Sequence, residues 1–197
     1  MPLILASTSP IRRALLESAG VSHEAVPARL DEEAIRAALA AEDTSPRDMA
    51  DALAEAKAEK VALKNPAAWV LGSDQVLDLH GEALGKAEGP EEAADQLRHL
   101  RGQTHKLHSA AVLYEAGKPV WRQITTAKLT MRPFSDTYLE DYLARNWGDV
   151  SYCVGAYKLE GEGVRLFQRI EGDYFTVLGL PLVEVLNYLT LRGVIAG

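Results

Sequence analysis

The chain has 197 residues with 47% hydrophobic content, enough to bury one substantial core, so we expect a single domain over residues 1–197. Its formal net charge of −7 argues against a nucleic-acid polymer as partner, because such binding requires a broad basic surface. No apolar run reaches membrane-spanning length, no secretory signal pattern is present, and the lone Cys153 offers no disulfide framework. These features predict a cytoplasmic location and no membrane partner.

The stretch LILASTSPIRRALL, residues 3–16, predicts a buried strand that leads directly into a helix. Ser9 followed by Pro10 is a favourable N-cap and first helical residue. Arg12 and Arg13 then lie in the first turn, where the helix dipole is already positive and unpaired N–H groups are expected. An anion, most often a phosphate, is expected there, whereas a solvated turn whose arginines cover apolar surface is the alternative.

Apolar runs alternate with helical patterns along the rest of the chain, which favours an α/β fold. Residues 23–33 predict a short strand that leaves into an acidic loop. The remaining predicted elements are a long helix from Ser45-Pro46 to about Lys64, a strand at 68–79, a helix at 89–102, a hairpin of strands 105–114 and 120–131, a helix from Ser135 to about Trp147, and a last helix starting near Pro181.

A carboxylate interrupts the apolar strand VLGSDQVLDL. Burying Asp74 is costly unless it is paired, hydrogen-bonded or metal-bound, so we expect it to have a partner; a turn or a solvated edge is the alternative. Gly72 beside it fits a bulge or the close approach of a ligand. A metal, if bound, would be hard and oxygen-bound, drawing on Asp74 and the acidic loop Asp31-Glu32-Glu33.

Other motifs exclude several kinds of site. GEALGKA, which contains Lys86, lacks the glycine spacing and the Ser or Thr of a P-loop, although Lys86 stays a candidate phosphate contact. His105 and His108 lie three apart on a predicted strand, so they are expected on opposite faces and are poor ligands for one metal. Cys153 is expected to be a small buried apolar residue.

Taken together, these motifs resemble those of the Maf family of nucleoside triphosphate pyrophosphatases. The matching stretches, in chain order, are LILASTSPIRRALLE, the pair Asp31-Glu32, LAEAKA, VLGSDQV, GEALGKA, QLRHLRGQTH, VGAYKLEGEG and IEGDYFTVLGLPL. The resemblance implies a Maf/inosine-triphosphatase-like α/β fold, with an elongated mixed β-sheet flanked by helices in two lobes around an active-site cleft. It also implies a homodimer.

The same resemblance implies hydrolysis of the α–β phosphoanhydride bond of a nucleoside triphosphate, giving a monophosphate and pyrophosphate. It places a set of mostly cationic side chains at the triphosphate: Ser7, Arg12, Arg13, Glu32, Lys57 and Lys86. Asp74 matches the carboxylate that accepts a proton from water, and Asp74 with Glu32 would hold a divalent cation, Mg²⁺ or Mn²⁺. A nucleotide-binding regulator of septum formation, which would need the clamp but not Asp74, is the alternative without turnover.

Three motifs distinguish two branches of this family. In the branch acting on dTTP and UTP they read S-P-R-R, A-D-T and G-A-Y-G-I-Q-G, and in the 7-methyl-GTP branch S-P-W-R-R, S-D-Q and G-S-F-K-x-E-G. Here they read SPIRR, SDQ and GAYKLEG, so Gln75, Lys158 and Glu160 side with the 7-methyl-GTP branch. The Glu160 carboxylate can accept hydrogen bonds from the base edge, whereas Ile11 replaces a tryptophan that could stack on a cationic base. The sequence therefore predicts a preference for 7-methyl-GTP, with broader selectivity, and dTTP or UTP hydrolysis as the alternative.

Overall fold

The computed structural model describes residues 1–196, so Gly197, the last residue of the expected domain, lies outside the described residues. In chain order the elements are β1 Leu3–Ala6, α1 Pro10–Ser18, β2 Glu24–Ala25, α2 Glu32–Ala41, α3 Pro46–Ala62, β3 Trp69–Leu79, β4 Glu82–Leu84, α4 Pro90–Leu100, β5 Thr104–Glu115, β6 Lys118–Met131, α5 Asp136–Val150, η1 Val154–Ala156, η2 Glu162–Leu166, β7 Phe167–Glu171, α6 Tyr174–Leu178 and α7 Leu182–Leu191. The helices and strands predicted above are present, and α2, β4, β7, α6 and the two short 3₁₀ helices η1 and η2 are additional to them.

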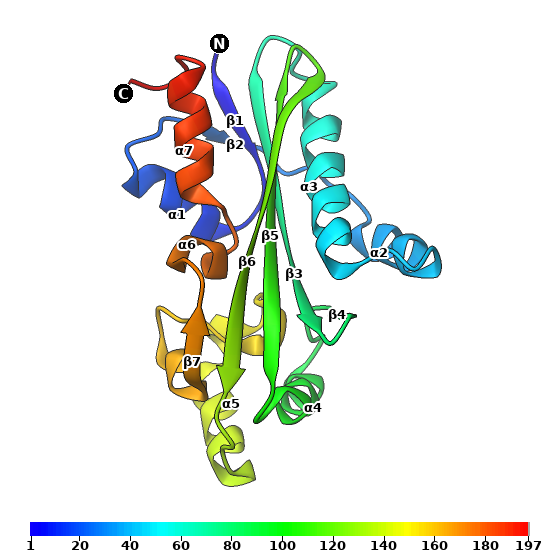
Figure 1. Cartoon of the computed structure of the whole chain (residues 1–197), viewed down its shortest axis with the longest axis vertical. Coiled ribbons are helices and arrows are strands. Elements are labelled where there is room, and N and C mark those ends of the chain that lie inside the picture. The colour runs from blue at the N-terminus through cyan, green and yellow to red at the C-terminus, as the bar shows by residue number, and fades with distance from the viewer. Residues whose placement is uncertain (197) are drawn as a thin grey trace.

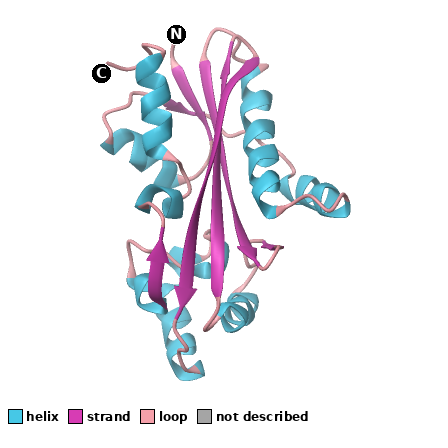
Figure 2. Ribbon diagram, in the orientation of Figure 1, coloured by secondary structure: helices cyan, strands magenta, loops and turns pink. Residues whose placement is uncertain are grey.

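One mixed sheet runs the length of the molecule in the order β2-β1-β3-β5-β6-β7, with β4 also paired to β3 (Figure 1). β1 is parallel to both β2 and β3, whereas the pairs from β3 through β7 are antiparallel. The long strands β3, β5 and β6 give the molecule its elongated shape (Figure 2). The elongated mixed sheet flanked by helices is therefore confirmed.

Different helices cover the sheet in its two halves (Figure 1). In the half near the termini, α3 packs on the face that carries Val70, and α1 and α7 pack on the face that carries Leu71. In the other half, α4 and α5 pack on the face of Leu77, which by strand alternation is the face of Leu71. The half near the termini thus has an apolar core on each face of the sheet and the other half has one, and β3 contributes to all three.

The close packing of α3 on β3 depends on Gly72. A Cβ at this position would lie 2.1 Å from the backbone oxygen of Ala54 and 2.8 Å from the Cβ of Ala58. The close approach predicted at Gly72 is therefore made by the helix, and the predicted bulge or ligand contact is wrong. This packing holds α3, which carries Lys57, against the strand that carries Asp74.

The acidic loop predicted at residues 31–33 is also wrong. Asp31 is the N-cap of α2, with its side chain accepting a hydrogen bond from the N–H of Ala34 at 3.0 Å. The two glutamates that follow lie in the first turn, where negative charge is favourable. No residue of α2 is buried, although Ile35 and Leu39 pack partly against the core. α2 is therefore a helix held at the margin of the structure.

Candidate active site

A cleft lies where one edge of β3 has no neighbouring strand. β1 pairs with β3 up to Gly72, and β4 begins to pair at Leu77, so among residues 1–196 no strand covers that edge at positions 73–76. A cavity of about 370 Å³ opens at this gap, a volume typical of small-ligand sites. Its walls come from the β1–α1 turn, the region of α2, α3, and the segment 152–160.

The β1–α1 turn is shaped by serine side chains. Ser9 caps α1 as predicted, because its hydroxyl accepts a hydrogen bond from the N–H of Arg12 at 3.4 Å. The Ser7 hydroxyl accepts one from the N–H of Ser9 at 3.1 Å. The N–H groups of Arg12 and Arg13 both bond to Ser9, so the prediction that they are unpaired is wrong. Ser7 and Ile11 line the cavity.

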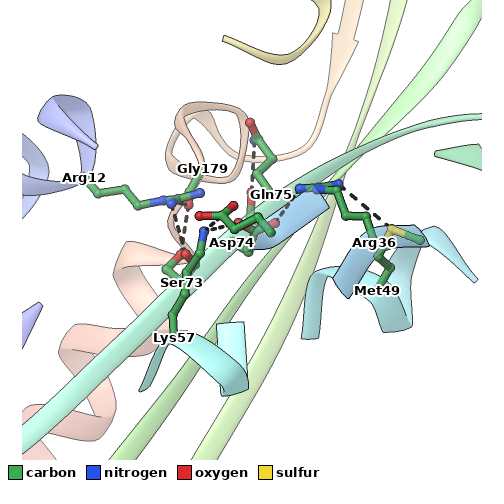
Figure 3. A network of polar contacts seen from close by, with 10 residues as sticks. Arg12, Arg36, Met49, Lys57, Ser73, Asp74, Gln75 and Gly179 are labelled. Carbon is green, nitrogen blue, oxygen red and sulfur yellow. Dashed lines mark hydrogen bonds and ion pairs between the residues drawn. The ribbon is translucent and has the colours of Figure 1, made fainter. Parts of the chain in front are cut away.

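Arg12 is buried and lines the cavity. Its guanidinium donates hydrogen bonds to the backbone oxygens of Gly179, at 2.7 Å, and Ser73, at 3.0 Å (Figure 3). Burial lowers the pKa of Arg12, and the nearby carboxylates of Asp74 and Glu32 oppose that shift. Arg12 therefore joins α1 to β3 and to the end of α6 while placing a positive charge at the cleft.

Arg13, the second predicted phosphate residue of this turn, lies elsewhere. Its side chain is 54% exposed, with its Nε 4.0 Å from a carboxylate oxygen of Glu17 on the next turn. Neighbouring residues of a helix point about 100° apart, so Arg12 and Arg13 cannot face the same space without a change in rotamer. The structure does not bring Arg13 to the cavity.

Asp74 has both carboxylate oxygens paired with cations (Figure 3). It is only 4% exposed. Lys57 Nζ lies 2.5 Å from Oδ1, and Arg36 Nη2 lies 3.0 Å from Oδ2. Lys57 Nζ also lies 3.0 Å from Glu32 Oε2. Asp74 thus has two partners, where the sequence predicts at least one, and these ion pairs offset the cost of burying the carboxylate.

The sequence pattern does not indicate a role for Arg36, because residues 31–33 read as an acidic loop and not as the start of a helix. The signal that identifies the helix is Asp31 as an N-cap followed by the apolar residues Ile35 and Leu39 at helical spacing. No local pattern indicates that the arginine between them contacts Asp74. That contact exists because α2 lines the cleft in the folded chain, through Glu32 and Arg36.

Lys86 and Glu160, both predicted, line the same cavity. Cys153 also lines it and is only partly buried, so the prediction of a small buried apolar residue is wrong. Burial raises the pKa of the Cys153 thiol to about 11. A thiol that ionises so weakly is a poor nucleophile, which argues against covalent catalysis at this position.

Gln75, predicted to set specificity, lines the cavity, but its amide nitrogen is bonded to other parts of the protein. This nitrogen donates hydrogen bonds to the Ser109 hydroxyl at 3.1 Å and to the backbone oxygens of Thr176 and Val177 at 3.0 Å. Gln75 therefore anchors α6 to the sheet.

The Lys158 ammonium is already engaged by neighbouring side chains. Its ammonium donates to an Asp149 carboxylate oxygen at 2.7 Å and lies 4.8 Å from the ring centroid of Tyr152. Burial by itself would lower the pKa of Lys158, but these two partners raise it above its usual value. Lys158 lines the cavity as a paired cation.

His105 and His108 lie on opposite faces of β5, as predicted. His105 Nε2 is 2.7 Å from the Tyr157 hydroxyl, while His108 Nε2 is 3.0 Å from Oδ2 of Asp78 on the other face. Burial lowers the pKa of His105 to about 4, so this histidine is neutral at pH 7. Tyr157 lines the cavity, and its hydroxyl is held by His105.

The predicted metal ligands Asp74 and Glu32 converge on the same ammonium group, that of Lys57. Within residues 1–196 no group of three or more His, Cys, Asp or Glu side chains is arranged to hold a metal ion. Mg²⁺ is often bound by one or two carboxylates, with waters and substrate phosphates as the other ligands. Both carboxylates are paired with cations in this structure, so a divalent cation would have to displace one of those partners and take its other ligands from water and phosphate oxygens.

Known proteins match the chain over most of its length. A family model described as Maf-like protein matches residues 2–191. A "Nucleoside triphosphate pyrophosphatase" from Roseobacter denitrificans is 59% identical over 192 residues, covering 98% of this chain and 96% of the relative. A "7-methyl-GTP pyrophosphatase" from Rhizobium meliloti is 49% identical over 193 residues, covering 98% of this chain and 97% of the relative. A solved HAM1 protein from Coxiella burnetii has a TM-score of 0.43 at 15% identity, covering 68% of this chain and 74% of that one. The resemblance inferred from the motifs is thus confirmed, and the chain belongs to the Maf family.

Proposed function

We propose that this chain hydrolyses the α–β phosphoanhydride bond of nucleoside triphosphates, leaving a nucleoside monophosphate and releasing pyrophosphate. Its family and the relatives named nucleoside triphosphate pyrophosphatase support this activity. The observation that carries it is a buried carboxylate, Asp74, in a cavity that also contains the cations Arg12, Lys57 and Lys86. Such a cavity matches a polyphosphate, which needs local cations and a group that acts on water.

In the proposed complex Arg12, Lys57 and Lys86 bind the phosphates through charge-assisted hydrogen bonds, which are stronger than those between neutral groups. The Ser7 hydroxyl, which lines the cavity, is a further donor. Arg13 stays a prediction, because its exposed side chain would have to rotate to join them.

The proposed reaction is an attack of water on the α-phosphorus. A bond forms from the water oxygen to phosphorus, the bond from phosphorus to the bridging oxygen breaks, and pyrophosphate leaves with that oxygen. Asp74 orients the water and accepts its proton. We assign Asp74 and Glu32 as the protein ligands of a divalent cation, Mg²⁺ or Mn²⁺, which neutralises phosphate charge when bound. Lys57 bridges these two carboxylates and keeps them directed at the same space.

We further propose 7-methyl-GTP as the preferred substrate. Glu160 lines the cavity, and relatives named 7-methyl-GTP pyrophosphatase are 46–49% identical to the chain. A carboxylate can accept hydrogen bonds from the N1 and N2 groups of a methylated guanine. Gln75 contributes indirectly, by positioning α6, and Ile11 offers an apolar contact without stacking. Hydrolysis of dTTP or UTP is the alternative.

The test is a panel of nucleoside triphosphates that includes GTP, 7-methyl-GTP, dTTP and UTP. Pyrophosphate and orthophosphate are measured separately, and kcat/KM is compared between the wild type and Glu160→Gln. We expect pyrophosphate as the product, the highest kcat/KM for 7-methyl-GTP, and a loss of that preference in the variant. Binding without turnover would favour the regulator of septum formation, and a preference for dTTP or UTP would favour the other branch.

Four properties of the protein remain predictions from the sequence: a single domain, a homodimer, a cytoplasmic location and the lack of a nucleic-acid partner. In the described part of the chain, residues 1–196, no helix combines the length and apolarity needed to cross a bilayer.

A further inference from the structure

Arg36 lines the cleft and contacts Asp74, yet neither the motifs nor the proposed chemistry assign it a role. Its Nη2 donates to Oδ2 of Asp74 at 3.0 Å, and its Nη1 lies 3.9 Å from the sulfur of Met49 (Figure 3). Together with Lys57 it leaves each oxygen of the proposed catalytic carboxylate beside a positive charge. In this arrangement a third cation cannot approach Asp74 closely without displacing Arg36 or Lys57.

Arg36 and Lys57 differ in how firmly they are held. The side chain of Lys57 is 9% exposed and is shared between Asp74 and Glu32, whereas the side chain of Arg36 is 23% exposed. Arg36 is therefore the partner of Asp74 that can leave at the lower cost.

The surroundings of Arg36 also allow movement. No residue of α2 is buried. Behind α2 lies a second, shallow cavity that is open to solvent, between α2, the start of α3 and the turn after β3. Arg36 lines both this cavity and the cleft. α2 is thus held by partial packing of Ile35 and Leu39, and its Arg36 lies between the two cavities.

We propose that Arg36 changes partners when substrate binds. In the free protein it covers Oδ2 of Asp74, and in the complex it passes to the phosphates and leaves that oxygen to the attacking water. A triphosphate carries more negative charge than one carboxylate and offers the planar guanidinium a bidentate contact, so it competes well for this arginine. The inference rests on the proposed function, and it assigns Arg36 as a positioning residue for Asp74 and a binding residue for substrate.

The test compares Arg36→Met and Arg36→Lys with a matched control, Arg47→Met. Arg47 is an exposed arginine near the start of α3, 3.8 Å from Asp48 and outside both cavities. Two affinities are measured. Calorimetry gives the affinity of the protein for an α,β-methylene triphosphate analogue, which cannot be cleaved at the reacting bond. Electron paramagnetic resonance gives the affinity of the nucleotide-free protein for Mn²⁺. Thermal melts verify that each variant is folded.

For Arg36→Met we expect the affinity for the analogue to fall about tenfold or more, as for the loss of one charge-assisted hydrogen bond. We expect Mn²⁺ to bind the nucleotide-free variant more tightly than the wild type, because a positive charge beside Asp74 has been removed. Arg36→Lys should recover part of the analogue affinity, and Arg47→Met should match the wild type. A purely structural role for Arg36 would lower both affinities together.

Unchanged analogue binding in Arg36→Met, or Mn²⁺ binding that is unchanged or weaker, would overturn the exchange of partners. If the wild type nevertheless binds the analogue and releases pyrophosphate from substrate, only the role of Arg36 is overturned and the proposed function is retained. A wild type that does neither would overturn both proposals.

Discussion

Asp74→Asn tests the centre of the cleft, because the amide keeps the shape of the side chain and removes the charge that two cations face. Breaking a buried ion pair costs about 3–5 kcal/mol. The cost should be smaller here, since Glu32 still pairs with Lys57 and Arg36 is partly exposed, so we expect a loss of about 2 kcal/mol in the free energy of unfolding. Turnover should fall about 100-fold or more, as for the loss of a group that acts on the attacking water.

The matched control is Asp78→Asn. Asp78 lies on the same face of the same strand and is 5% exposed, with Oδ2 at 3.0 Å from His108 Nε2 and 3.3 Å from Lys106 Nζ, but it lies outside the cavity. Urea unfolding and initial rates of pyrophosphate release are measured for both variants at a temperature where both are folded. We expect both to lose stability and only Asp74→Asn to lose turnover. Near wild-type turnover in Asp74→Asn, or an equally inactive Asp78→Asn, would refute the role given to Asp74.

Three further predictions follow from the site and its supports. Excess chelator should abolish pyrophosphate release and added Mg²⁺ or Mn²⁺ should restore it; full activity in the chelator would contradict the use of a divalent cation. His105 has a folded-state pKa of about 4 against an ordinary value of 6.5, so the unfolded chain binds the proton first and stability is lost as pH falls from about 6.5 to about 4. At about 1.4 kcal/mol for each unit, the loss reaches about 3 kcal/mol, and His105→Gln should remove this part of the pH dependence in urea titrations; an unchanged pH profile would count against it. Gly72→Ala should lower the melting temperature strongly, because its Cβ would meet the Ala54 backbone oxygen at 2.1 Å, whereas Gly85→Ala, in open space, should not; equal melting temperatures would show that α3 can shift.

The sequence by itself determined most of the local structure, and the family. Ser9, Ser45 and Ser135 cap helices as predicted, because a cap uses only a side chain and an N–H group two or three residues away. The long strand through Asp74 and the hairpin after it follow from runs of apolar residues, which fold the same way in many contexts. The need of Asp74 for a partner follows from the cost of burying a charge anywhere.

Only the tertiary structure decided which partners meet. Arg12 and Arg13 are adjacent in the sequence, yet the rotation of the helix turns one into the cleft and the other to solvent. Gly72 has a backbone neighbour because α3 packs on β3, and no feature near Gly72 in the chain indicates that helix. Arg36 reaches Asp74 across 38 positions of sequence, through the docking of α2 at the margin of the cleft. Contacts of this kind depend on how whole elements pack, and a local pattern of residues carries no information about them.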